Sequence, residues 1–296
     1  MPRAWLLLLI VFAATGCGNS YRHYGGEYPK NLPRIVISLS PSATEIIAFD
    51  GHPGQLHGRT EACNFPINIS QTVPVYGGVK PNYEKLMRAK PDVVVYDAKL
   101  YSPADISKLE ETIGKNKLFG FNANTIDDFE FQLRKLGVMI ASPMPISKYI
   151  DKIDRERSTA KSMSPAVHPK MAVMTGTLAA GTKSFLADVM RSVGAEPVGP
   201  DADRFVQMDP ETLIQANPDI VVLAADLNRL TDLTARRKVA AAAQAAFLAD
   251  PRYRSIGAAV KQRVFVMDGD ILLRQGSRVD TLIQNFAKVV QSSVPR

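Results

Sequence analysis

One pattern of polar and apolar positions occurs twice in the chain, at residues 84–96 and 211–223, with an offset of 127 residues. In each copy a glutamate opens a short amphipathic stretch that turns one leucine inward, Leu86 or Leu213, and a Pro-Asp pair follows. A run of β-branched and other apolar residues comes next. Proline ends a helix, and such a run is typical of a strand buried on both faces of a parallel sheet. The pattern therefore predicts a helix followed by a buried strand in each copy.

A second pair of similar segments supports a repeated plan. Residues 34–39 and 170–175 are both short apolar runs that precede a helical pattern, and their offset is 136 residues. Because the two offsets are similar, we expect two related lobes, residues 34–142 and 169–296. Alternating strands and helices predict an α/β fold in which each lobe is a mostly parallel sheet flanked by helices.

The segment between the lobes, residues 143–168, has a helical rather than a flexible pattern. Its apolar residues recur at helical spacing, with charged residues on the opposite face. They are Ile146, Tyr149, Ile150 and Ile153. We expect a single long helix that joins the lobes and leaves one cleft between them.

The N-terminus has the pattern of an export signal. A positively charged start is followed by the apolar residues 4–13 and by Ala14-Thr-Gly-Cys17, which resembles the lipobox of bacterial lipoproteins. We expect residues 1–16 to be a signal peptide, Cys17 to carry the lipid, and residues 17–33 to be a tether. The protein would then be extracytoplasmic and anchored to a bacterial membrane, in the periplasm or at the cell surface.

The composition of the chain excludes several other classes of protein. The chain has 36 Lys and Arg against 29 Asp and Glu, a formal net charge of +7, but the two signs are interleaved and form no basic stripe for nucleic acid. No apolar run reaches the length of about 20 residues that a spanning helix requires, so a polytopic membrane protein is excluded. With Cys17 lipidated, Cys63 lacks a disulfide partner, and we expect it to be a small buried packing residue.

The motifs of common enzymes are absent from the sequence. There is no Gly-x-Gly-x-x-Gly, no phosphate-binding Gly-x-x-x-x-Gly-Lys-Ser/Thr and no Gly-x-Ser-x-Gly, and none of the four His residues has a metal-ligand spacing. We therefore expect no enzyme, no metal site and no cofactor. The alternative from another class is a bilobal α/β enzyme of tetrapyrrole or sugar metabolism.

The loop after the first predicted strand offers candidate ligand contacts. Ser42 and Glu45 have the spacing of a capping box, and Pro41 stands early in the helix that they open. The backbone N–H groups of that helix terminus would face the cleft. Ser42 is accordingly a candidate ligand-binding residue.

The mature chain resembles a known family over nearly its whole length. It is similar to the helical-strut periplasmic binding proteins, the substrate-binding lipoproteins of ABC importers for cobalamin and ferric siderophores. The similarity lies in the order and spacing of several segments. They are residues 35–46, 58–66 and 75–78, the two Glu…Pro-Asp copies, residues 257–266 and residues 274–278.

The resemblance implies a function for the repeated glutamates. In this family an exposed glutamate on each lobe docks into arginine-rich pockets of the membrane permease, and Glu84 and Glu211 occupy the matching positions. The implied partner is therefore the permease of an ABC importer in the inner or cytoplasmic membrane.

The resemblance also implies a ligand, cobalamin or a related corrinoid, captured in the inter-lobe cleft; a ferric siderophore or haem is the alternative. The segment around Arg59 and Cys63 is closer to the cobalamin binders, although the mature chain has no Trp, which such pockets often use. Flat apolar walls for a corrin ring would come from aromatic residues near strand ends. The candidates are Phe65, Tyr76, Tyr96, Phe121 and Phe205.

Four arginines distinguish between the possible ligands. Several guanidinium groups converging in the cleft would suit an anionic ferric siderophore, whereas a corrinoid needs few. The four are Arg59, Arg204, Arg274 and Arg278, of which Arg59 and Arg274 are candidate ligand contacts and Arg278 is a candidate brace for the last helix. The sequence leaves open whether they converge.

Overall fold

The computed structural model of the protein describes residues 35–78 and 80–293. The predicted signal peptide, the lipidation site Cys17 and the predicted tether lie outside the described residues. None of the helices in the described part of the chain is both long and apolar enough to span a membrane.

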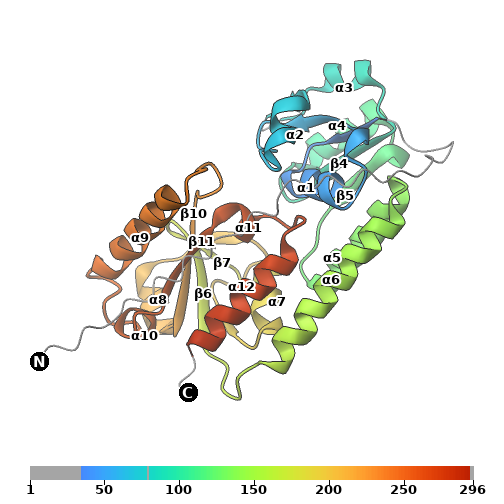
Figure 1. The fold of residues 1–296 in the computed structure, drawn as a ribbon. Coiled ribbons are helices and arrows are strands. Elements are labelled where there is room, and N and C mark those ends of the chain that lie inside the picture. Colours follow the sequence, from blue (N-terminus) through green and yellow to red (C-terminus); the bar gives the residue numbers. More distant parts are fainter. Residues whose placement is uncertain (1–34, 79, 294–296) are drawn as a thin grey trace, which may run out of the picture. The chain divides into compact units, whose positions relative to one another are not determined.

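The chain divides into two compact units, which are described separately (Figure 1). The N-terminal unit contains the described residues up to 156 and also residues 274–280. The C-terminal unit contains residues 157–273 and the described residues from 281 to 293.

The N-terminal unit is built on a five-stranded sheet in which all paired strands are parallel, in the order β3-β2-β1-β4-β5. The strands are β1 (Val36–Ser38), β2 (Leu56–Thr60), β3 (Val75–Gly77), β4 (Val93–Asp97) and β5 (Leu118–Phe121). The helices are α1 (Pro41–Phe49), α2 (Ile67–Thr72), α3 (Tyr83–Ala89), α4 (Pro103–Ile113) and α5 (Ile126–Met139), with 3-10 turns η1 (Pro53–Gln55) and η2 (Lys115–Lys117). Helix α1 packs on β1, β2 and β4, and α4 packs on β5.

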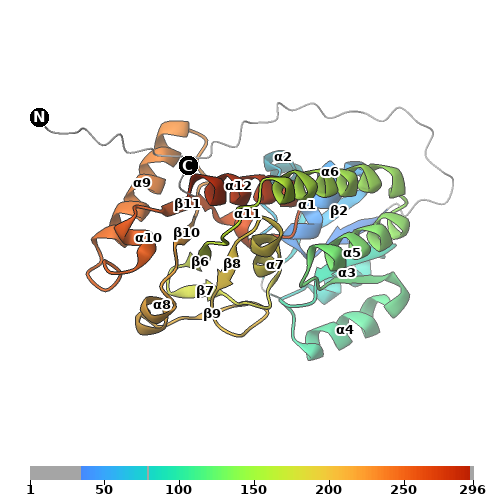
Figure 2. The ribbon, with the colours of Figure 1, turned by 90° about the horizontal axis from the view of Figure 1, so that it is seen from below.

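The C-terminal unit has a six-stranded sheet in the order β11-β10-β6-β7-β9, with β8 also paired to β6. Its strands are β6 (Lys170–Thr175), β7 (Leu178–Ala180), β8 (Glu196–Val198), β9 (Phe205–Gln207), β10 (Ile220–Ala225) and β11 (Val264–Asp268). Its helices are α7 (Phe185–Ser192), α8 (Pro210–Ala216), α9 (Leu233–Ala249), α10 (Gly257–Val260) and α11 (Gly269–Leu273). Helix α9 lies along β10 and β11 (Figure 2). The pairs β6–β7 and β7–β9 are antiparallel and the others are parallel, so the predicted α/β class with mostly parallel sheets is confirmed.

Two further helices have residues in both units. A continuous helix, α6 (Pro143–Ser162), covers most of the predicted connector, and the division between the units falls within it. Its predicted apolar face is buried, as expected for Ile146, Tyr149, Ile150 and Ile153. Helix α12 (Val279–Ser292) is the second of them. Its first two residues are the end of the segment 274–280, which belongs to the N-terminal unit although the chain before and after it belongs to the C-terminal unit. We call residues 274–280 the strap.

The repeated Glu…Pro-Asp pattern has the same structural cause in both units. The helix before it ends in a residue with left-handed backbone, Lys90 in one copy and Asn217 in the other, and proline follows at once. The aspartate carboxylate then accepts a hydrogen bond from the chain at the start of the first strand of its unit: Asp92 from the N–H of Ile35, one residue before β1, at 2.9 Å, and Asp219 from the N–H of Lys170, the first residue of β6, at 3.2 Å. The motif therefore joins the strand after it to the first strand of the same sheet.

Candidate functional site

The strand order of the N-terminal unit defines where a ligand would bind in that unit. Chain order reverses between β1 and β4, and in open α/β sheets ligands bind outside the carboxyl ends of the strands at such a point. We call this side the carboxyl edge of the sheet. It is formed by the loop after β1 and by the segments that follow β2, β4 and β5.

The predicted capping box at the start of α1 is wrong. The N-cap is Ser40, whose hydroxyl accepts a hydrogen bond from the Ala43 N–H at 3.2 Å, and Pro41 is the first helical residue. Ser42 and Glu45 therefore stand too far into the helix to cap it. The Ser42 side chain is buried, which favours packing over contact with a ligand.

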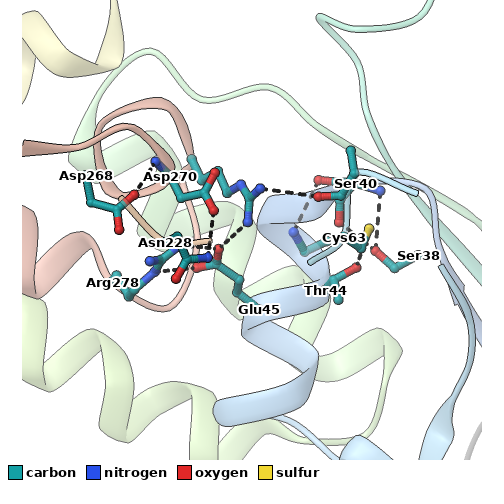
Figure 3. A network of polar contacts seen from close by, with 12 residues as sticks. Ser38, Ser40, Thr44, Glu45, Cys63, Asn228, Asp268, Asp270 and Arg278 are labelled. Atoms are coloured by element: carbon teal, nitrogen blue, oxygen red, sulfur yellow. Dashed lines mark hydrogen bonds and ion pairs between the residues drawn. The ribbon is translucent and has the colours of Figure 1, made fainter. Parts of the chain in front are cut away.

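Glu45 instead forms a buried ion-pair network with the strap. Its side chain has 0% exposure and lies between two guanidinium groups that are 12% and 15% exposed. Arg274 Nη1 donates to Glu45 Oε1 at 3.1 Å; Arg278 donates through Nη2 to Oε1 at 2.6 Å and through Nε to Oε2 at 3.1 Å. Figure 3 shows Arg278 and Glu45 turned toward each other. The two-point contact of Arg278 fixes the geometry of the carboxylate.

The same network continues through small polar residues around β1. The hydroxyl of Ser38 donates to the Ser40 carbonyl at 2.8 Å, and Thr44 donates to the Cys63 sulfur at 3.0 Å (Figure 3). Cys63 is fully buried, which confirms its predicted packing role. Nearby, Tyr101 donates to the Leu39 carbonyl at 3.2 Å, and burial raises the pKa of its phenol to about 12. This hydroxyl therefore stays protonated at neutral pH.

The structure shows the surroundings of the four arginines that the sequence could not place. Arg274 and Arg278 converge on Glu45. Arg59 donates to the carbonyls of Val73 and Thr60, both at 2.9 Å, and of Ser70, so its guanidinium braces the chain around β2. Arg204 belongs to the C-terminal unit, where it is exposed and lies 3.8 Å from Asp203.

The candidate aromatic residues fall into two groups. Tyr96 and Phe121 are 8% and 2% exposed and belong to the core of the N-terminal unit, which favours packing. Phe65, Tyr76 and Phe205 are only partly buried. The guanidinium of Arg278 lies 4.2 Å from the centroid of the Phe65 ring, and the Lys85 ammonium lies 4.5 Å from that of Tyr76.

A second polar group lies at the strand ends of the C-terminal unit. The Asn228 amide donates to the Asp270 carboxylate at 2.8 Å, and the Asp270 N–H donates to the Asp268 carboxylate at 3.0 Å (Figure 3). Sequence reasoning did not single out these residues. Nowhere in residues 35–78 and 80–293 do three or more His, Cys, Asp and Glu side chains form a group that could hold a metal ion.

The two repeated glutamates are surface residues in equivalent local structures. Glu84 lies in the first turn of α3 with its side chain 79% exposed, and Arg88 one helical turn away is 3.7 Å from it. Glu211 lies in the first turn of α8 and is also exposed. Each helix buries its leucine, Leu86 or Leu213, on the opposite side.

Comparison with known proteins identifies the class of protein. Residues 36–271 match the family described as periplasmic binding protein. The chain belongs to this family, whose members bind substrates for transport and are not enzymes.

Individual relatives agree with this assignment. The chain is 22% identical over 275 residues, 90% of its length and 82% of the relative's, to the uncharacterized ABC transporter substrate-binding lipoprotein YvrC of Bacillus subtilis. Its fold is similar to the periplasmic vitamin B12 binding protein BtuF of Vibrio cholerae (TM-score 0.70, 17% identity, 88% of this chain and 98% of that one). It is also similar to a periplasmic heme binding protein of Pseudomonas aeruginosa (TM-score 0.69, 20% identity, 89% and 95%).

Proposed function

We propose that this protein is the extracytoplasmic substrate-binding lipoprotein of an ABC importer, and that it captures cobalamin or a related corrinoid and delivers it to the permease. The observation that carries the delivery step is the matched pair Glu84 and Glu211, exposed in the first turns of equivalent helices. Paired anionic residues in a repeated setting suit electrostatic docking on a basic partner surface.

The choice of ligand has separate support. In the N-terminal unit the three candidate arginines are engaged by Glu45 or by backbone carbonyls, an arrangement that suits a ligand with few negative charges. Phe65 and Tyr76 are partly exposed aromatic rings of the kind that line a site for a flat macrocycle. Haem is the second candidate, because structural neighbours include heme-binding proteins; a ferric siderophore is the third.

Retention of ligand through desalting tests this proposal. Purified protein is incubated with cobalamin, a ferric siderophore and haem together, desalted, and examined by visible spectroscopy. We expect the corrinoid absorption to remain with the protein. A retained haem or siderophore band would change the ligand assignment, and a colourless protein would contradict capture of all three.

The lipid anchor is tested by the Cys17→Ala variant. Because an acyl chain contributes about 0.8 kcal/mol per buried methylene, loss of the acylated residue is expected to move the protein from the membrane fraction to the soluble extracytoplasmic fraction. The Cys63→Ala variant is the matched control and should remain with the membrane, since Cys63 is buried in the fold. Equal membrane retention of wild type and Cys17→Ala would refute the anchor.

A further inference from the structure

The strap is firmly built into the N-terminal unit. The Tyr149 hydroxyl on α6 donates to the Gly276 carbonyl at 2.7 Å and accepts from the Val279 N–H at 3.0 Å. The Lys152 ammonium lies 2.6 Å from the Asp280 carboxylate. These contacts hold the start of α12 against α6 and fix the position of the strap residues that precede it.

The strap lies at the carboxyl edge of the sheet. Arg274 Nη2 donates to the Ala62 carbonyl at 3.2 Å, two residues beyond β2, and Gln275 Nε2 donates to the Ala123 carbonyl at 3.0 Å, two residues beyond β5. Strands β1 and β4 stand between β2 and β5 in the sheet order. Adjacent strap residues therefore reach to both sides of the point where strand order reverses, which is the position expected for a ligand.

Glu45 determines what charge the strap presents at the carboxyl edge of the sheet. Two guanidinium groups of the strap point at its buried carboxylate. A Cβ on Gly276 would lie only 2.4 Å from Glu45 Oε2, so glycine is what allows the strap backbone to approach the carboxylate. The arrangement is thus adapted to bring Glu45 and both arginines together.

We infer that Glu45 is a positioning residue that determines ligand specificity. Because Glu45 binds Arg274 and Arg278, neither guanidinium group is available to the ligand, and the site selects ligands that carry no negative charge at their periphery. This inference rests on the proposed function and adds the charge class of the ligand. A corrinoid whose ring substituents are amides satisfies it. Haem, with two propionates, and carboxylate-rich ferric chelates do not.

The test compares ligands in pairs that differ in peripheral charge. Full-length wild type and the Glu45→Gln variant are titrated with cobalamin and haem, and with an uncharged ferric hydroxamate and ferric citrate. We expect wild type to prefer the uncharged member. In Glu45→Gln the preference should shift toward the anionic member by at least about tenfold, the factor that one charge-assisted hydrogen bond supplies.

One control variant and the wild-type ligand ratio separate specificity from stability. Glu130→Gln removes another well-buried glutamate of the same unit, one that lies 4.0 Å from Arg134 on α5, and should leave the ligand ratio unchanged. Circular dichroism shows whether Glu45→Gln folds. If it does not, the ratio of wild-type affinities for the uncharged and the anionic ligands still tests the inference, because a wild-type preference for the anionic ligands would overturn it.

The outcomes distinguish this inference from the proposed function. If wild type binds a ligand of either pair and folded Glu45→Gln keeps the wild-type ratio, the role of Glu45 is refuted and capture of that ligand stands. If wild type binds none of the four ligands, the proposed function fails, and the inference fails with it.

Discussion

Replacing Glu84 and Glu211 together with alanine is expected to abolish ligand uptake while ligand affinity stays close to the wild-type value. Both glutamates are surface residues in the first turns of short helices, and neither contributes to the core of its unit. A hydrogen bond to a charged group contributes about 1.5–3 kcal/mol when well formed. Losing two of them would weaken docking by at least about a hundredfold. The measurement is uptake of labelled ligand by cells that carry the cognate permease.

A matched control uses two other exposed glutamates, one in each unit. Glu111 on α4 and Glu196 on β8 are replaced with alanine, which removes the same total charge from the chain. This variant should import ligand normally. Normal uptake by the Glu84/Glu211 variant would mean that the two residues only favour the starts of their helices. A large loss of its ligand affinity would instead place them in the binding site.

Much of the fold could be predicted from the sequence, because the decisive signals are local. The Pro-Asp copies predict a helix end followed by a buried strand, and both consequences depend on neighbouring residues alone. The structure adds a contact that explains the aspartates: Asp92 and Asp219 each accept a backbone hydrogen bond at the start of the first strand of their unit. The antiparallel strands β7 and β9 were not anticipated, since segments of three residues carry too little periodicity.

The candidate site was harder to predict, because its contacts join residues far apart in the sequence. The spacing of Ser42 and Glu45 suggested a local cap, whereas the actual partners of Glu45 are 229 and 233 residues away. One signal was present: Glu45 is the only charged residue of its helix and directly precedes the apolar residues Ile46 and Ile47, and a buried carboxylate requires a cationic partner. The strap supplies two arginines, but no local pattern shows that this segment belongs to the N-terminal unit.

Arg59 shows a different limit of sequence reasoning. A guanidinium group has five N–H donors, and those donors serve equally well for an anionic ligand or for backbone carbonyls. In the fold they meet the carbonyls of Val73, Thr60 and Ser70. The presence of an arginine at position 59 therefore indicates that its side chain donates hydrogen bonds, but it does not indicate whether the acceptor is a ligand or the backbone.

A second acidic group in the N-terminal unit makes folding stability depend on pH. Asp50 follows the last turn of α1, and its Oδ2 atom is shielded from water and has no hydrogen-bond partner among the residues that the structure describes. Burial, reinforced by the nearby negative charge of Asp280 and opposed by Lys152, raises the pKa of Asp50 from 3.8 to about 8. At neutral pH the carboxyl group is therefore protonated in the fold.

The direction of the pH dependence follows from proton linkage. Between about pH 4 and pH 8 the folded chain keeps a proton on Asp50 that the unfolded chain releases, so the folded state binds more protons. The contribution of Asp50 to the free energy of unfolding is then fully present below pH 4 and is lost as the pH rises toward 8. Because one pKa unit corresponds to about 1.4 kcal/mol, the loss across this range is on the order of a few kcal/mol.

The Asp50→Asn variant should remove this dependence, because its amide stays neutral at every pH. We expect the variant to match wild type near pH 4 and to become progressively more stable than wild type up to about pH 8, with a constant difference above that value. Urea unfolding at a series of pH values measures the difference, and Asp151→Asn, an exposed aspartate on α6, is the control that should show none. Parallel stability curves for wild type and Asp50→Asn from pH 4 to pH 8 would mean that Asp50 is ionised in the fold. Lys152, which pairs with Asp280, would then have to stabilise the Asp50 carboxylate as well.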